Sequence, residues 1–129
     1  MDHFKVINDT YGHLAGDLVL QKISAIVAQT VREGDLFARF GGEEFVILMR
    51  DAHIKNALDL AERIRAKISN AEIIHDGQKI KVTVSCGLSE IEDNHKDYLD
   101  LIAMADQFLY RAKKQGRNRT CFSQDNLSA

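Results

Sequence analysis

The sequence predicts an α/β sandwich, in which helices cover a mixed and largely antiparallel sheet. Apolar residues recur at helical spacing in three segments, and between the first two of these lie two apolar runs separated by a Gly-Gly turn. The resulting order is helix, two strands, helix, strand or hairpin, helix, strand. The chain has no proline, repeat or low-complexity stretch, so we expect a single domain.

The first predicted helix spans residues 16–32 and ends at Glu33-Gly34. Its apolar residues fall on one face: Val19, Leu20, Ile23, Ile26, Val27 and Val31. Asp17 lies in the first turn, where the helix dipole favours an acid. Residues 36–40 and 45–49 are predicted strands, and the glycines of Gly41-Gly42-Glu43-Glu44 favour a hairpin because tight turns need positive φ.

The rest of the chain continues this alternation. Apolar spacing predicts helices over 57–68 and 101–112. Between them, Asp76-Gly77 indicates a turn, and residues 80–88 alternate as a strand. A short strand over 119–122 completes the predicted fold.

Composition and charge exclude several classes of function. The formal net charge is −2, whereas a nucleic-acid polymer usually requires a strongly basic face. Cys86 and Cys121 lack the number and spacing of a disulfide framework or a zinc site, so we expect reduced cytosolic thiols. No apolar run approaches about 18 residues. We therefore expect a cytoplasmic segment without membrane contact, although a longer parent can carry a membrane anchor.

The most unusual local feature is the pair of adjacent carboxylates, Glu43 and Glu44, at the Gly-Gly turn. Carboxylates bind hard cations such as Mg²⁺, which bridge to substrate phosphates, and glycine lets a ligand approach the backbone closely. A solvated hairpin tip has the same composition. From the residues alone, the solvated tip is the favoured interpretation.

A basic cluster lies at the end of the third predicted helix and in the loop after it: Arg111, Lys113, Lys114, Arg117 and Arg119. Cations at a helix C-terminus stabilise its dipole, which alone explains such a cluster. Lys113 and Arg117 could equally clamp a triphosphate, since arginine makes bidentate contacts. The two interpretations stay open.

Polar residues between 4 and 13 form a third candidate. Asn8 and Asp17 together offer an amide and a carboxylate, which can recognise the edge of a guanine. Both residue types are also routine at helix ends, and that structural interpretation is favoured without further context. The five histidines are scattered without metal-binding spacing.

Five segments occur in an order and spacing typical of one family. They are the run from Asp2-His3-Phe4-Lys5 to Asn8-Asp9-Thr10-Tyr11-Gly12-His13, then Gly16-Asp17, Arg39-Phe40-Gly41-Gly42-Glu43-Glu44-Phe45, Val82-Thr83-Val84-Ser85-Cys86-Gly87, and Ala105-Asp106 with residues 110–119. Together they resemble the GGDEF domain, the catalytic domain of bacterial diguanylate cyclases. The resemblance predicts a domain over residues 1–122, with 123–129 as a C-terminal tail.

The resemblance implies a fold like that of nucleotidyl cyclases and polymerase palms. It implies that two GTP molecules condense into cyclic di-GMP with release of pyrophosphate, in a homodimer with one GTP in each domain. The residues that would bind GTP divide by the part of the nucleotide they meet: Gly41, Gly42, Asn8 and Asp17 for guanine, and Phe4, Lys5, Lys113 and Arg117 for the triphosphate.

The same resemblance implies a pair of Mg²⁺ or Mn²⁺ ions. Glu43 would be a metal ligand, and the backbone carbonyl of Met1 would be another. Glu44 would be a further ligand or would help to deprotonate the attacking 3′-hydroxyl, and the sequence does not divide these roles. The metals would stabilise both the attacking and the leaving oxygen.

An inhibitory product site is implied by Arg32-Glu33-Gly34-Asp35, an Arg-x-x-Asp sequence five residues before Gly41. In the family, such a motif resembles the site where cyclic di-GMP binds through Arg32 and Asp35, and Arg63 is a weaker candidate to complete it. Without the family, an exposed ion pair at a helix end is the simpler interpretation.

One departure from the family concerns the start of the chain. A metal-binding aspartate would lie immediately before the position of Met1, at the end of a first central strand that this sequence lacks. We therefore expect an N-terminally truncated domain that makes little cyclic di-GMP, from a parent with an upstream sensor or receiver domain. The alternative function is a catalytically inactive module that binds GTP or cyclic di-GMP.

Overall fold

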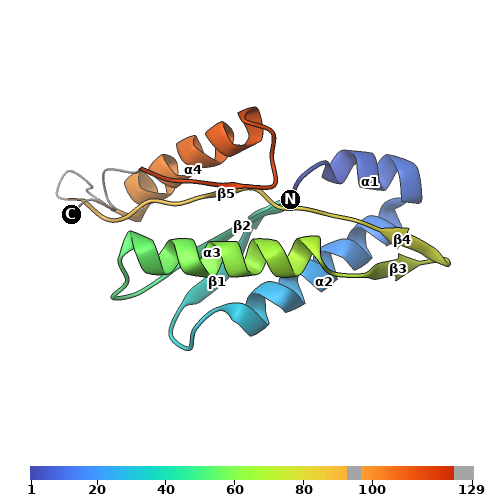
Figure 1. Cartoon of the computed structure of the whole chain (residues 1–129), viewed down its shortest axis with the longest axis horizontal. Coiled ribbons are helices and arrows are strands. Elements are labelled where there is room, and N and C mark those ends of the chain that lie inside the picture. The colour runs from blue at the N-terminus through green and yellow to red at the C-terminus, as the bar shows by residue number, and fades with distance from the viewer. Residues whose placement is uncertain (93–96, 124–129) are drawn as a thin grey trace.

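The computed structural model of the chain describes residues 1–92 and 97–123 (Figure 1). Four helices are present in this part of the chain: α1 Phe4–Tyr11, α2 His13–Thr30, α3 Ile54–Ser69 and α4 Tyr98–Lys114. The last three confirm the predicted helices. None of the described helices is long and apolar enough to cross a membrane. Of the predicted tail, 123–129, only Ser123 lies within the described residues.

The N-terminal helices differ from the prediction in three respects. The stretch after Asp2, treated as a polar segment, is the helix α1, which buries Ile7 against the core. Gly12, with φ 92°, separates α1 from α2, so α2 begins three residues before Gly16. A positive φ at this junction favours glycine. At the other end, Val31 is extended at ψ 153°, and α2 therefore ends before the predicted Glu33.

The strands form three two-stranded sheets within the described residues. β1 Leu36–Gly41 pairs antiparallel with β2 Glu44–Leu48, which confirms the predicted hairpin. β3 Ile73–His75 and β4 Gln78–Ile80 form a second antiparallel pair around the predicted turn. β5 Cys86–Gly87 runs parallel to β6 Thr120–Cys121. Strand pairing is thus mixed and mostly antiparallel, as the sequence predicts.

The predicted strand over 80–88 is interrupted. β4 ends at Ile80, and residues 81–85 belong to no ladder in the described structure. The alternation that suggested a strand is real, because Val82 and Val84 are buried whereas Lys81 is exposed. A ladder also needs a hydrogen-bonded neighbour, which apolar alternation cannot supply.

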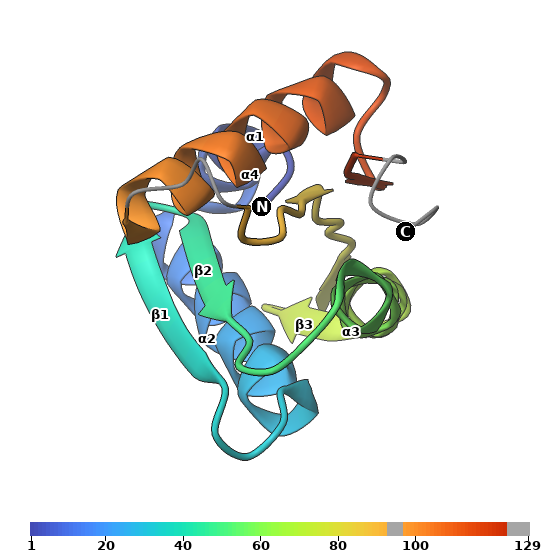
Figure 2. The same cartoon turned by 90° about the vertical axis from the view of Figure 1, so that its left-hand side faces the viewer.

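The N-terminal residues lie between the hairpin and this segment (Figure 2). The amine of Met1 donates to the backbone carbonyl of Glu43 at 3.1 Å. The N–H of Asp2 donates to the carbonyl of Thr83 at 2.9 Å. Residues 1 and 2 therefore link the tip of the hairpin to the 81–85 segment and lead directly into α1.

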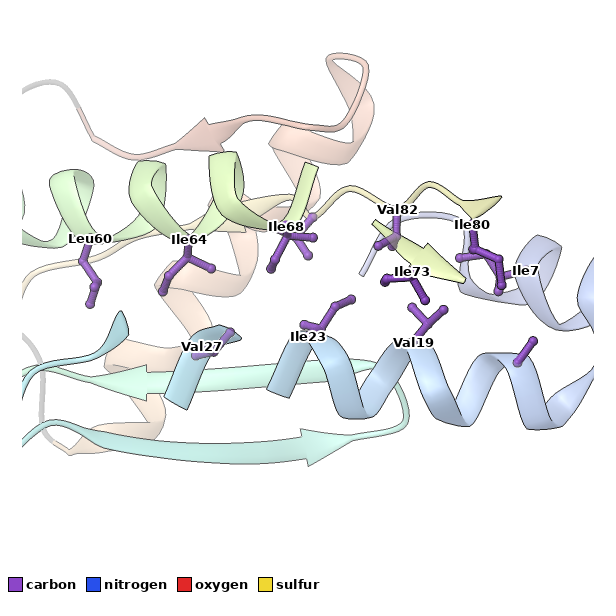
Figure 3. Close-up of a cluster of buried hydrophobic side chains, with 12 residues drawn as sticks. Ile7, Val19, Ile23, Val27, Leu60, Ile64, Ile68, Ile73, Ile80 and Val82 are labelled. Atoms are coloured by element: carbon purple, nitrogen blue, oxygen red, sulfur yellow. The ribbon is translucent and has the colours of Figure 1, made fainter. Parts of the chain in front are cut away.

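The hydrophobic core lies between α2 and α3. Ile23 and Val27 of α2 point toward α3, Leu60, Ile64 and Ile68 point back, and Val19 faces Ile73 (Figure 3). Ile73 and Ile80 of the second hairpin extend the same cluster. Each such side chain stabilises the fold by about 2 kcal/mol when it is removed from water. This core fixes α2 under the loops that carry the polar candidates.

Candidate active site

A small cavity lies where the tip of the β1–β2 hairpin, the start of α1 and the end of α4 converge. Its volume is about 190 Å³, and its lining consists of Met1, Asp2, His3, Phe4, Lys5, Glu43, Lys113 and Arg117. Six of these residues were predicted from the sequence: Met1, Phe4, Lys5, Glu43, Lys113 and Arg117. Ligand pockets for whole small molecules usually exceed about 300 Å³. The volume therefore suits a phosphate chain better than an entire nucleotide.

The hairpin tip leaves its glycines open to a ligand. Gly41 and Gly42 have φ values of 148° and 51°, and no atom lies within 4 Å of where a side chain would be on either residue. The guanidinium Nε of Arg39 donates to the carbonyl of Gly42 at 2.7 Å, which holds the turn in place. A flat group could thus reach the backbone of this turn without meeting a side chain.

The two carboxylates of the turn differ in exposure. Glu43 is half-buried and lines the cavity, whereas Glu44 is exposed and lies outside its lining. Lys113 Nζ approaches Glu44 Oε1 at 3.9 Å, which is too long for a hydrogen bond. The lysine and the carboxylate are therefore near each other without being tightly joined.

The start of α1 adds hydrogen-bond donors to the cavity. His3 precedes the helix in a left-handed conformation, and no side chain caps the first turn. The first N–H groups of a helix lack internal partners and favour an anion.

Asn8 and Asp17 lie on neighbouring turns of α1 and α2, outside the cavity lining. Gly16 makes their approach possible, because a side chain there would overlap the amide of Asn8 and come within 3.3 Å of the ring of Phe4. Asp17 follows Gly16 and is exposed. The structure thus packs Asn8 against Gly16, the residue before Asp17, at a point outside the cavity lining.

Asp2 is a site residue that the sequence analysis missed. It is only 3% exposed, and its carboxylate accepts hydrogen bonds from the hydroxyls of Ser85 and Thr83 at 2.6 and 2.7 Å. A third bond comes from the N–H of Asn118 at 3.1 Å. Burial raises the pKa of the Asp2 carboxyl, but these hydrogen bonds outweigh burial and hold the pKa below its usual value.

The predicted product site lies at the opposite, open end of the hairpin. Arg32 Nη2 meets Asp35 Oδ1 at 3.0 Å and also donates to the carbonyl of Arg50 at 2.9 Å. The Asp35 side chain is 2% exposed, and that of Arg32 is 46% exposed. Hydrogen bonding to Arg32 lowers the pKa of the Asp35 carboxyl. Within the described residues, no hydrogen bond or ion pair joins Arg63 to this pair.

The donors for a metal ion are few. No group of three or more His, Cys, Asp or Glu side chains within the described residues could hold a metal ion. Glu43 and the backbone of Met1 lie together, since the Met1 amine bonds to the Glu43 carbonyl. Mg²⁺ commonly takes one or two carboxylates and completes its shell with water and substrate phosphates. The residues present thus fit Mg²⁺ or Mn²⁺ as part of a nucleotide complex.

Comparison with known proteins identifies the family. The family described as "Diguanylate cyclase, GGDEF domain" matches residues 1–119. The chain belongs to the GGDEF family. The matched range covers the cavity, both ends of the hairpin and the basic cluster at the end of α4, so every candidate above lies within it.

Individual relatives agree with this assignment. Diguanylate cyclase A of Treponema denticola is 42% identical over 98% of this chain and 34% of its own length. The structure of the active GGEEF domain of a diguanylate cyclase from Vibrio cholerae has a TM-score of 0.85 and 35% identity, covering 94% of this chain and 76% of that one. The GGDEF domain of DgcB from Caulobacter crescentus, in complex with c-di-GMP, has a TM-score of 0.90 and 30% identity, covering 94% and 72%.

These comparisons also bear on fold and extent. The predicted palm-like α/β fold is confirmed by the structural likeness to GGDEF domains. The chain spans about a third or less of the length of the curated relatives that it matches, with shares from 18% to 35%. The roles of individual residues therefore rest on the geometry described above.

Proposed function

We propose that this domain condenses two molecules of GTP into cyclic di-GMP and releases pyrophosphate. The observation that carries the proposal is the cavity in which the carboxylate Glu43 lies with the cations Lys5, Lys113 and Arg117. A carboxylate beside several cations is what a metal-bound triphosphate requires. The Vibrio cholerae domain described as active has the same GGEEF signature, which supports turnover rather than binding alone.

The triphosphate would lie in the cavity. Lys113 and Arg117 bind its oxygens from the end of α4, and arginine can make two parallel hydrogen bonds. Phe4 and Lys5 approach the β and γ phosphates from the start of α1, whose N–H groups favour an anion. The small volume of the cavity leaves the base outside it.

Guanine would then lie against the backbone of Gly41 and Gly42, where no side chain obstructs a flat ring. Asn8 and Asp17 would recognise its edge through one amide and one carboxylate. Gly16 supports this pair indirectly, because it allows Asn8 to pack against α2. Recognition of the base would thus depend on how closely α1 and α2 pack.

In the reaction, the 3′-oxygen of one GTP attacks the α-phosphorus of the other. A new phosphorus–oxygen bond forms, the bond from the α-phosphorus to the bridging oxygen breaks, and pyrophosphate leaves with the electron pair. Glu44 would act as the general base that accepts the proton of the 3′-hydroxyl. This residue is exposed and lies outside the cavity lining. Repetition of the step with the roles exchanged closes the cyclic product.

Glu43 and the backbone carbonyl of Met1 would hold Mg²⁺ or Mn²⁺ together with phosphate oxygens. When bound, the metal supplies positive charge that neutralises the phosphates and the leaving pyrophosphate. Glu43 is suited to its part because it is half-buried beside the cations rather than paired with them.

Two domains must face each other, because each would hold one GTP. A symmetric homodimer satisfies this need with one self-complementary interface. A sensor or receiver domain upstream in the parent would control how the two domains meet. The basic and acidic groups of the two cavities would then act on the two GTP molecules one after the other.

The test is product formation by the parent protein and by its Glu44→Ala variant. We expect GTP to give cyclic di-GMP and pyrophosphate in the parent, and chromatography to detect no cyclic di-GMP from the variant. Glu72→Ala is the matched control, because Glu72 only pairs with the exposed Lys79. Full activity in Glu44→Ala would overturn the assignment of this residue.

One observation favours a second candidate, a regulatory module that binds GTP or cyclic di-GMP without turnover. Within the described residues, fewer than three acidic, histidine or cysteine side chains gather at any potential metal site. A metal held by a single protein carboxylate would support nucleotide binding but slow turnover. Nucleotide binding without pyrophosphate release, in a protein with Mg²⁺ present, would support this candidate instead.

A further inference from the structure

We propose that Asp2 is a positioning residue, which holds the loop over residues 115–119 against the cavity and thereby fixes Arg117. This inference rests on the proposed function, in which Arg117 binds the GTP triphosphate. Asp2 and Arg117 line the same cavity, yet the contact between them runs through the backbone of the next residue, Asn118. Asp2 would thus act on GTP binding without touching GTP.

The loop that carries Arg117 has an unfavourable backbone conformation. Gly116, Arg117 and Asn118 have consecutive positive φ values of 123°, 65° and 46°. Glycine adopts such angles freely, but residues with a side chain do so at a cost. A loop of this kind keeps its shape only where its surroundings hold it.

Asn118 is held from two sides. Its N–H donates to Asp2 Oδ2 at 3.1 Å, and its side-chain Oδ1 accepts from Arg65 Nη1 of α3 at 2.9 Å. The N–H of Arg117 itself donates to the carbonyl of Ala112 in the last turn of α4 at 3.0 Å. The loop is therefore pinned to the N-terminal segment, to α3 and to α4.

Asp2 is itself firmly placed. Thr83 and Ser85 donate to its two carboxylate oxygens, and its own N–H donates to the carbonyl of Thr83. The side chain is nearly inaccessible to solvent, so these bonds are protected from competition by water. The Asp2 carboxylate thus fixes the loop that carries Arg117 relative to the 81–85 segment.

The sign of the effect separates positioning from simple electrostatics. A carboxylate in the lining of the cavity repels a triphosphate, so removing its charge would by itself tighten GTP binding. If Asp2 positions Arg117, its removal weakens binding instead. The loss of a hydrogen bond to a charged group corresponds to about a tenfold loss of affinity.

Asp2→Asn provides a matched variant. Its carboxamide oxygen can take the place of Oδ2 and accept from Thr83 and Asn118, while its NH₂ group donates to the hydroxyl of Ser85. Asn therefore removes the charge and keeps the grip on the loop, whereas Ala removes both. We expect Asp2→Asn to bind at least as tightly as wild type and Asp2→Ala to bind about tenfold more weakly.

The experiment is a double-mutant cycle on the binding of 3′-deoxy-GTP with Mg²⁺, measured by calorimetry in the full chain. The probe lacks the hydroxyl that reacts, so binding is read without turnover. The variants are Asp2→Ala, Asp2→Asn, Arg117→Ala and the double variant of Asp2→Ala with Arg117→Ala. We expect Asp2→Ala to cost no further affinity once Arg117 is absent, because its effect acts through that side chain.

Additive losses in the cycle, or an Asp2→Asn variant as weak as Asp2→Ala, would overturn this inference alone. Unchanged affinity in Arg117→Ala would instead overturn the assignment of Arg117 to the triphosphate, and with it the proposed function. If Asp2→Ala does not fold, Arg65→Ala releases Asn118 from the other side. We then expect Arg65→Ala to weaken binding of the probe in the wild-type background and to have no further effect in the Arg117→Ala background. Additive losses of affinity would contradict the proposal.

Discussion

The two ends of the β1–β2 hairpin both carry charged side chains, which are tightly paired at one end and held apart at the other. At the open end, Arg32 and Asp35 are joined by several hydrogen bonds, and the acid is shielded from solvent. At the turn, Lys113 comes no closer than 3.9 Å to Glu44, and Glu43 makes no side-chain hydrogen bond within the described residues. Charges satisfied internally support the fold, whereas charges left apart beside a cavity are available to a ligand.

The largest expected effect is at the turn. Glu43→Gln in the parent should lower the rate of cyclic di-GMP formation about 10²-fold or more, because it removes a carboxylate from beside the reacting phosphates. The melting temperature should change little, since the Glu43 side chain supports no hydrogen bond of the fold in the described residues. Initial rates and a thermal melt check both parts. A large fall in melting temperature with normal turnover would show that Glu43 supports the fold and not the reaction, which contradicts the comparison between the two ends.

The open end should respond in the opposite way. Asp35→Ala removes the acceptor for the Arg32 backbone and guanidinium, so the free energy of unfolding should fall by about 2 kcal/mol. Urea denaturation measures this loss. The control is Asp59→Ala, an exposed acid in the middle of α3. Equal stability of the Asp35 and Asp59 variants would show that the pair at the open end contributes nothing to the fold.

Arg32→Ala should sharpen the comparison, because Arg32 is also the proposed contact for the product. We expect cyclic di-GMP to bind about tenfold more weakly and product inhibition to be relieved, without a lower initial rate. Arg32 is 46% exposed, so a ligand can reach it even while it is paired with Asp35. Calorimetry with cyclic di-GMP decides the matter. Unchanged product affinity would leave the pair with a structural role only.

The pH dependence of stability should be the smallest effect. The pKa of Asp35 is lowered in the folded state, so its contribution is present above its ordinary value of 3.8 and is lost as pH falls through the folded pKa. The stability difference between wild type and Asp35→Asn should therefore shrink as the pH falls below about 4. Denaturation at several pH values tests this. A constant difference across the acid range would contradict the assigned shift.

Much of the fold could be predicted from the sequence, because three helices and the Gly-Gly hairpin follow from apolar spacing and turn chemistry. The helix α1 could not be predicted, because it buries only Ile7 and its polar residues are of the kinds found in loops. The interruption at 81–85 was also hidden, because periodicity reports which side chains are buried and not which backbone has a neighbour.

The candidate site divides in the same way. Sequence motifs selected six residues that line the cavity, because these residues lie in or beside the segments that resemble the family. Asp2 was missed, because its importance depends on hydroxyls and a loop more than 80 positions away along the chain. The available signal was that Thr83 and Ser85 alternate with two buried valines, which places both hydroxyls on the other side of the segment.

Product formation from GTP tests most directly whether the cavity is the site of a diguanylate cyclase. The measurement is turnover by the parent protein at saturating GTP and Mg²⁺, with cyclic di-GMP and pyrophosphate quantified together. We expect both products, with two pyrophosphates released for each cyclic di-GMP formed. A parent protein that binds GTP and forms neither product would contradict the proposed function and leave a nucleotide-binding module in its place.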